Sequence, residues 1–402
     1  MGCKMEKQIL RLISFCLMLI IFLVPVETYA EKLASEHMTK TTELRMPSIP
    51  EKMIRFTFQS GYNFEYPDAV RGIYVTGHSA GGERFNSLID LLDNTDLNAM
   101  VIDIKDDFGY ITYVPEEASP YKGISKPYIR NPQDMMKRLE EHQIYPIARI
   151  VVFKDSVLAE NRPDLSFTEN DKVWKNRRGE AFVNPFLKEV WDYNVDIAIK
   201  AAKMGFKEIQ FDYVRFPEGF ERRDEILAYG TGDYHGGDRN NVQKRVDAVT
   251  DFVAYAREQL QPYGVDVSVD IFGYSATISE APGIGQNFSR ISENVDVISS
   301  MIYPSHWTSY FGISKPDLHP YELVSAYAKV ENEILSRLEN RPISRPWLQD
   351  FTASYLGAGN YKVYGKEEVE AQIRALYENG ITEFLLWNAG NRYTQGVNYK
   401  LE

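Results

Sequence analysis

From residue 66 onward, short apolar runs alternate with longer stretches in which apolar residues recur at helical spacing. The short runs are rich in Val, Ile, Tyr and Phe, which is typical of buried strands. Amphipathic helical patterns separate most of the runs, and the one at residues 279–294 is short. We expect strands at residues 70–77, 98–106, 144–153, 208–216, 265–273, 295–303, 346–352 and 383–390. The order of the patterns predicts consecutive βα units.

Eight βα units in a row predict a closed (β/α)8 TIM barrel, an α/β fold, as a single domain over residues 66–402. A doubly wound open sheet is the alternative, but it rarely uses eight regular units. Gly205 and Gly380 directly follow two of the helical patterns, where glycine commonly caps a helix. Residues 31–65 are polar and mixed, and we interpret them as a linker and lead-in to the barrel.

The first thirty residues have a different pattern. Lys4, Lys7 and Arg11 precede an apolar run over residues 12–26, and Thr28-Tyr29-Ala30 follows it. This layout predicts a Sec signal peptide over residues 1–30, and therefore a protein that is secreted or associated with the cell envelope. The alternative is an uncleaved anchor, although the run is short for a span of about 20 residues. After cleavage we expect no membrane contact.

Composition narrows the chemistry. Both cysteines, Cys3 and Cys16, lie in the predicted signal peptide, so the mature chain has no disulfide and no thiol nucleophile. The net charge of −12 argues against nucleic acid or anionic lipid as a partner. It also fits poorly with a strongly anionic polymer, unless basic residues are concentrated in one cleft. We expect no cofactor and a monomeric protein.

The active site of a TIM barrel lies at the carboxyl ends of its strands. Candidate residues were therefore taken only from those ends. Asp212 and Asp270 are the candidate catalytic pair. The candidate substrate-binding residues are Tyr74, His78, Asp103, Lys105, Arg149, Arg215, Glu218, Tyr303, His306, Gln349, Asp350, Trp387 and Asn388.

Alternation of side chains along a strand refines this set. It predicts that Asp212 and Asp270 face the barrel axis from adjacent strands, with Arg149 on the strand before them. Asp103 and Lys105 are expected to share the inward face of the second strand. Gln349 and Asp350 are consecutive, so only one of them can face inward and the other is structural.

Two carboxyl groups facing one cavity are the requirement for glycoside hydrolysis. One must remain charged and the other must keep its proton, so their surroundings must differ. We assign Asp212 as nucleophile and Asp270 as acid/base, with Glu218 as the substitute if Asp270 is not the acid. The structural alternative for Asp212 is an ion pair with Arg149 or Arg215. Sequence spacing leaves retaining and inverting outcomes open, because they depend on a distance in space.

Several stretches carry a family resemblance: RGIYVTG, NAMVIDIKDDFG, QFDYVRFPEG, VDIFGY, MIYPSHW and WLQDF. Over residues 68–398 the chain resembles a family of exported bacterial glycosyl hydrolase domains related to the α-amylase-type barrels. The resemblance implies a nucleophile at Asp212, an acid/base at Asp270 and a helper carboxylate at Asp350. The chain departs from the amylase pattern at two points. Arg215 follows the nucleophile by three residues instead of preceding it by two, and the acid is an aspartate instead of a glutamate.

Other chemistries fit less well. The six histidines have no metal-ligand spacing, and the acidic stretches near Asp106-Asp107 and Asp233–Asp238 lack a complete calcium pattern, so we expect no metal. Residues 77–81 read Gly-His-Ser-Ala-Gly, a formal match to a serine-hydrolase elbow, but on the first strand of a barrel. A barrel that binds a cell-wall or extracellular glycan without cutting it is the main alternative. A poly- or oligosaccharide is the expected partner in either case, and its sugar is unspecified.

Overall fold

The computed structural model of the protein describes residues 58–116 and 119–400. The predicted signal peptide, and the lead-in up to residue 57, lie outside the described residues. Residues 58–65 are described and run past two connections that lead into strands. The backbone N–H of Phe58 donates to the Pro262 carbonyl, and that of Asn63 donates to the Glu140 carboxylate.

Eight parallel strands close into a barrel, which confirms the predicted fold. They are β1 (Arg71–Val75), β2 (Ala99–Lys105), β5 (Tyr145–Val151), β8 (Glu208–Asp212), β9 (Asp266–Phe272), β10 (Val297–Met301), β12 (Trp347–Gln349) and β13 (Phe384–Trp387). Each strand pairs with the next in this order, and β1 also pairs with β13, which closes the sheet.

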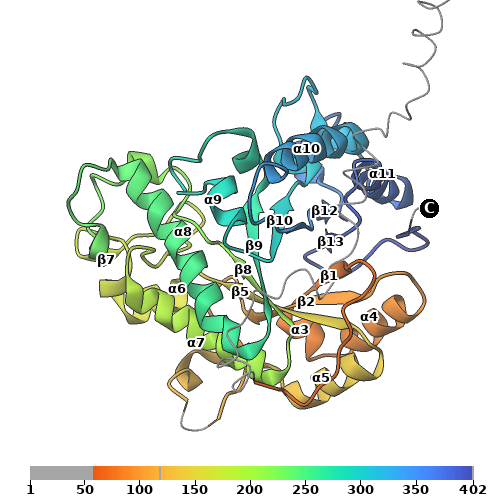
Figure 1. Ribbon diagram of the computed structural model, residues 1–402, viewed down its shortest axis with the longest axis horizontal. Coiled ribbons are helices and arrows are strands. Elements are labelled where there is room, and N and C mark those ends of the chain that lie inside the picture. The colour runs from red at the N-terminus through yellow and green to blue at the C-terminus, as the bar shows by residue number, and fades with distance from the viewer. Residues whose placement is uncertain (1–57, 117–118, 401–402) are drawn as a thin grey trace, which may run out of the picture.

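Helices surround the strands, which lie at the centre of the view in Figure 1. The helices are α3 (Gly77–Ala80), α4 (Arg84–Asp93), α5 (Pro132–Glu141), α6 (Ser156–Asn161), α7 (Lys188–Met204), α8 (Asn241–Leu260), α9 (Phe288–Ser292), α10 (Pro320–Leu335) and α11 (Lys366–Tyr377). Across residues 58–116 and 119–400, none of them is both long and apolar enough to cross a membrane.

Short strands decorate the barrel outside the eight predicted ones. They are β3 (Ile111–Tyr113), β4 (Ser125–Ile129), β6 (Thr168–Glu169), β7 (Lys172–Val173) and β11 (Ile343–Ser344). β3 pairs antiparallel with β2, and β6 and β7 form a hairpin in the long connection between β5 and α7. That hairpin lies at the periphery of the molecule, at the left of Figure 1.

Apolar side chains pack on both faces of the barrel wall. Between strands and helices, Phe211 of β8 contacts Phe252 of α8, with 5.5 Å between ring centroids. Inside the barrel, Val101, Ile147 and Leu385 belong to a separate buried cluster. Strands buried on both faces need nearly continuous apolar sequence, which is why these runs are legible in the chain.

Candidate active site

A cleft of about 1080 Å³ opens at the carboxyl ends of the strands. Its floor is formed by the ends of six strands, and its outer wall by residues 174–182 and 215–226. Eight of the predicted site residues line it: Arg149, Asp212, Arg215, Glu218, Asp270, Tyr303, His306 and Trp387. The strand-end rule therefore brings both candidate catalytic residues into one cavity.

Asp212 is the last residue of β8 and is almost completely buried. The Nε and Nη2 atoms of Arg149 donate to its Oδ2 atom over 3.0 and 2.6 Å. The backbone N–H of Tyr213 donates to its Oδ1 atom over 2.6 Å. Charged donors of this kind stabilise a carboxylate in its ionised form.

The chain turns sharply after Asp212. Tyr213 has φ of 53°, in the left-handed region that non-glycine residues rarely adopt. The expected strand to residue 216 therefore ends at Asp212, and the expected packing of Tyr213 on the helices is wrong. Its ring lines the cleft instead, with the Lys154 ammonium 3.9 Å from the ring centroid. A strained residue beside a candidate nucleophile fits a functional constraint.

Asp270 lies on β9 in different surroundings. The β8–β9 register pairs Phe211 with Val269, so Asp212 and Asp270 are the next residues along the two strands. Burial raises the pKa of Asp270 well above its ordinary value, and the charge of Asp212 raises it further. Trp347 opposes this by donating its indole N–H to Oδ1 over 2.7 Å. The adjacent carboxyl groups therefore differ in the way that acid–base chemistry requires.

Arg149 joins Asp212 to a second layer of acidic residues. Its Nη1 atom donates to Asp103 over 2.6 Å and its Nη2 atom to Asp107 over 3.0 Å. Burial raises the pKa of Asp103 to about 6, although Arg149 lowers it and Tyr74 donates a hydrogen bond to it over 2.5 Å. Asp103 and Tyr74 do not line the cleft. They hold Arg149 from below and would act on a substrate only through it.

Aromatic side chains form one side of the floor. Trp387 stacks on Tyr74 with 4.0 Å between ring centroids and lies 6.3 Å from Tyr303. His306 follows, 5.1 Å from Tyr303, and burial lowers its pKa. Flat apolar faces beside polar groups are suited to stacking against sugar rings.

Arg215 and Glu218 lie at the opposite side. Arg215 is buried, and its guanidinium carbon is 4.8 Å from the ring centroids of both Phe272 and Tyr213. Glu218 is mostly exposed and pairs with Arg215 over 3.3 Å. The structural alternative for Asp212 is thus a pair with Arg149, and Arg215 is free of it.

Lys105 does not face the barrel interior, so its expected orientation is wrong. The β2–β5 register shifts between Asp103 and Lys105, which reverses the alternation beyond this point. Lys105 instead forms a fully buried ion pair with Asp155 over 2.6 Å and donates to Asn194 of α7. It anchors the barrel wall to the helices and is not placed to contact a substrate.

Four other candidates lie outside the cleft lining. His78 is exposed on α3 and stacks against Tyr128, with 3.7 Å between ring centroids. Gln349 accepts from the Ser305 N–H and donates to Asp317, so it fixes the loop after β10. The segment after β13 is shaped by two contacts of the same kind, Asp350 accepting from Thr394 and Asn388 donating to the Arg392 carbonyl. Both members of the Gln349-Asp350 pair are therefore structural.

Sequence reasoning missed much of the outer wall. Trp174, Lys175, Arg177, Arg178, Phe182, Arg222 and Arg223 all line the cleft. A signal was present, because an unusually long connection between the third and fourth strands lies on the functional side of a barrel. The glycine-rich loop at residues 229–241, which attracted attention instead, contributes nothing to the lining.

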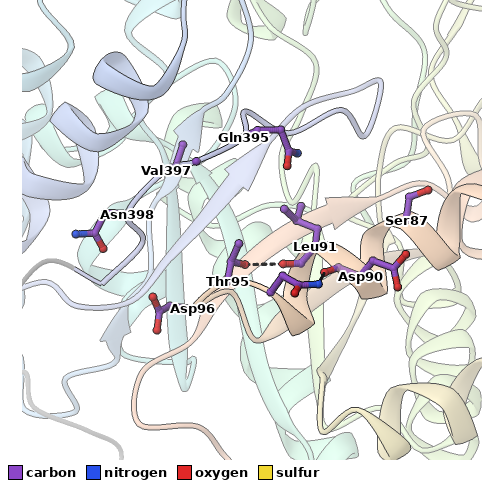
Figure 2. Close-up of a pocket in the computed structure, with 10 residues that line it drawn as sticks. Ser87, Asp90, Leu91, Thr95, Asp96, Gln395, Val397 and Asn398 are labelled. Atoms are coloured by element: carbon purple, nitrogen blue, oxygen red, sulfur yellow. Dashed lines mark hydrogen bonds between the residues drawn. The ribbon is translucent and has the colours of Figure 1, made fainter.

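A second hollow lies outside the barrel, between α4 and the segment at residues 395–398 (Figure 2). It includes Asp90 and Asp96, and none of its ten lining residues is basic or aromatic. Thr95 donates to the Leu91 carbonyl there, which completes the end of α4. Among residues 58–116 and 119–400, no group of three acidic, histidine or cysteine side chains could hold a metal ion.

With this geometry in hand, comparison with known proteins is informative. A family described as "Putative glycosyl hydrolase domain" matches residues 72–393, which is most of the chain. The chain belongs to this family. It therefore carries a glycosyl hydrolase domain, as the motifs at the strand ends indicated. A search of curated proteins finds no match.

Solved structures support the fold. The glycoside hydrolase domain of PgaB (BpsB) from Bordetella bronchiseptica is 16% identical over 80% of this chain and 94% of that chain, with a TM-score of 0.56. A hypothetical protein from Ruminiclostridium thermocellum ATCC 27405 is 35% identical over 49% of this chain and 96% of that chain, with a TM-score of 0.42. TtGalA, an alpha-galactosidase from Thermus thermophilus, is 11% identical over 83% of this chain and 60% of that chain, with a TM-score of 0.48.

Proposed function

We propose that the protein hydrolyses O-glycosidic bonds of a poly- or oligosaccharide with Asp212 as nucleophile and Asp270 as acid/base. One observation carries the proposal: two buried carboxyl groups on adjacent strands face one cleft in opposite electrostatic surroundings. Arg149 stabilises a charged Asp212, while burial and the charge of Asp212 favour a protonated Asp270. Membership in a glycosyl hydrolase family supports the same chemistry.

The proposed reaction has two steps. Asp270 donates its proton to the glycosidic oxygen while an Asp212 oxygen attacks the anomeric carbon, and the bond to the leaving sugar breaks. The product is a glycosyl ester on Asp212. Asp270, now a carboxylate, takes a proton from water as that water attacks the same carbon and releases Asp212. Trp347 holds Asp270 in place through both steps.

The first experiment is a glycan screen that measures new reducing ends, with Asp212→Asn and Asp270→Asn beside the parent protein. Each variant should lose about 10³-fold in kcat on a natural glycan. An aryl glycoside with a good leaving group should distinguish the roles. Asp270→Asn should still form the glycosyl ester from it, because that leaving group needs no proton, whereas Asp212→Asn should not.

Two further variants act as controls. Asp350→Asn should lose stability but keep its kcat, because Asp350 binds the Thr394 loop outside the cleft. Glu218→Gln should also keep its kcat; if it instead reproduces the Asp270→Asn profile, Glu218 is the acid. If the parent binds a glycan without cutting it and Asp212→Asn binds equally well, a glycan-binding barrel replaces the hydrolase.

The proposed site of action is outside the cytoplasm. The basic start, the apolar run and the Thr28-Tyr29-Ala30 sequence support export with cleavage after residue 30. N-terminal sequencing of the protein recovered from the culture medium or cell envelope should then begin at Glu31. A first residue within the apolar run, or retention of Met1, would contradict this cleavage.

A further inference from the structure

The charge of the cleft is opposite to that of the chain. The chain has a net charge of −12, yet seven basic and five acidic side chains line the cleft. One of the acidic groups, Asp270, has a raised pKa and so contributes little negative charge. The hollow beside α4, by comparison, has two acidic lining residues and no basic one among its described residues. Positive charge is therefore concentrated where the substrate would lie.

The basic residues are not distributed evenly within the cleft. Arg149 lies on the floor, where Asp103, Asp107 and Asp212 neutralise it. The other six lie on the outer wall, from two separate connections: Lys175, Arg177, Arg178, Arg215, Arg222 and Arg223. The wall beside the candidate catalytic pair is thus a basic surface, which we call the arginine wall.

Arg215 is the buried member of the arginine wall, with a side chain only 6% exposed. A guanidinium has five N–H donors. Two partners are present: the Phe216 carbonyl at 3.1 Å and Glu218 at 3.3 Å, whose side chain is 57% exposed. A buried charge with one long contact to an exposed carboxylate is incompletely compensated. Its stacking between Phe272 and Tyr213 leaves a fixed guanidinium lining the cleft.

The exposed members of the arginine wall are also under-neutralised. Arg177 and Arg223 form no ion pair within the part of the chain that the structure describes. Arg178 lies 3.8 Å from the same Glu218 that pairs with Arg215, so one carboxylate serves two guanidinium groups. Exposed arginines elsewhere have closer partners: Arg162, for example, pairs with Asp164 over 2.6 Å and with Glu189 over 2.8 Å.

We propose that the cleft binds an anionic glycan, whose carboxylate or sulfate groups lie against the arginine wall while its sugar rings lie on the aromatic floor. This rests on the proposed function for the chemistry, although binding by itself does not require cleavage. Arg215 recognises the charged group nearest the scissile bond, because a planar guanidinium fork matches a planar anion. Arg177 and Arg223 contact charges farther along the chain. A groove of one sign also raises the local concentration of such a polymer.

The proposal is tested with paired substrates. Polyuronates are compared with the same polymers after their carboxyl groups have been reduced to alcohols, and a sulfated glycan series is run beside them. Binding is measured by calorimetry with Asp212→Asn, and kcat/KM with the parent. We expect at least tenfold tighter binding of the anionic member of a pair at low salt. The preference should fall steeply as the salt concentration approaches about 0.5 M, because exposed charges are then screened.

Matched variants identify the wall. Arg177→Gln with Arg223→Gln should weaken binding of the anionic glycan about tenfold and leave its carboxyl-reduced form within twofold. Lys329→Gln with Arg374→Gln changes the net charge equally, on exposed positions of α10 and α11, and should leave both unchanged. Arg215→Lys keeps the charge but loses the fork. It should raise KM for the anionic substrate more than it lowers kcat, which a purely structural role would not do.

The outcomes separate this inference from the proposed function. Salt-sensitive binding of anionic glycans that the paired arginine variant weakens, with no cleavage of any glycan, supports the inference and overturns the hydrolase. Cleavage of a neutral glycan that neither salt nor the arginine variant alters supports the hydrolase and overturns the inference. Equal binding of a polyuronate and its reduced form also overturns the inference.

Discussion

At the scale of single residues, Asp212 and Asp270 show how surroundings assign different roles to the same side chain. They occupy corresponding positions on neighbouring strands. Arg149 contacts Asp212 with two donors, whereas the described partner of Asp270 is the neutral indole N–H of Trp347. A charged donor stabilises a carboxylate more strongly than a neutral one. The acid and the nucleophile are therefore distinguished by their neighbours.

Trp347→Phe tests this assignment through pH. The Trp347 hydrogen bond lowers the pKa of Asp270, so its loss should raise that pKa further. A general acid works only when protonated, and activity therefore falls as pH rises through its pKa. The alkaline limb of kcat/KM should move to higher pH by somewhat less than about one pH unit, which is the effect of a hydrogen bond of about 1 kcal/mol.

Trp307→Phe is the matched control, since Trp307 does not line the cleft. Its pH profile should coincide with that of the parent. A shift of the Trp347→Phe alkaline limb to lower pH would show that Asp270 is not the acid.

At the scale of elements, local breaks in regular strands decide which side chains reach the cleft. β2 follows simple alternation up to Asp103 and then loses it at the register shift before Lys105. β8 ends at Asp212, where the left-handed Tyr213 redirects the chain. Asp103 and Asp212 thus face inward as alternation predicts, while the residues after them do not. Such irregularities are concentrated beside functional sites.

The buried pair between Lys105 and Asp155 makes an element-scale prediction. Both side chains are fully buried, so Lys105→Met would leave the Asp155 carboxylate without its cation. The free energy of unfolding, measured with urea, should fall by about 3–5 kcal/mol. Lys137→Met removes an exposed pair with Glu141 and should change it by under about 0.5 kcal/mol.

A second mutation separates structure from substrate binding at this position. Adding Asp155→Leu to Lys105→Met should recover much of the lost stability, less the loss of the cap that Asp155 provides to α6. The KM of the folded double variant should match the parent. A large increase in KM would return Lys105 to the substrate site.

At the scale of the whole molecule, the two ends of the barrel have different tasks. The carboxyl ends of the strands carry the cleft, and the opposite end carries a buried ionic cluster. There Arg345 donates to Glu208 and Glu383 over 2.8 Å and to the hydroxyl of Tyr66 over 2.9 Å. These residues come from the starts of three elements that close the sheet. The cluster therefore ties the barrel together away from the chemistry.

Arg345→Met should separate the two tasks. It leaves two buried carboxylates unpaired, so the free energy of unfolding should fall by about 3–5 kcal/mol or more. The kcat of the folded fraction should stay within about twofold of the parent value. Arg149→Met, at the other end, should instead reduce kcat strongly, because Arg149 contacts Asp212 directly. Equal losses of kcat in the two variants would refute this division.

The sequence by itself determined the barrel, its strand order and the strand ends at which Asp212, Asp270, Arg149 and Tyr303 meet. It could do so because buried parallel strands need continuous apolar runs, and because a closed barrel brings all carboxyl ends to one face. Tertiary structure alone decided the rest. The bulge that reverses Lys105, the indole of Trp347 on Asp270 and the arginine wall all depend on contacts between segments far apart in the chain. Periodicity records which face of its own element a residue occupies, and it does not record what packs against that face.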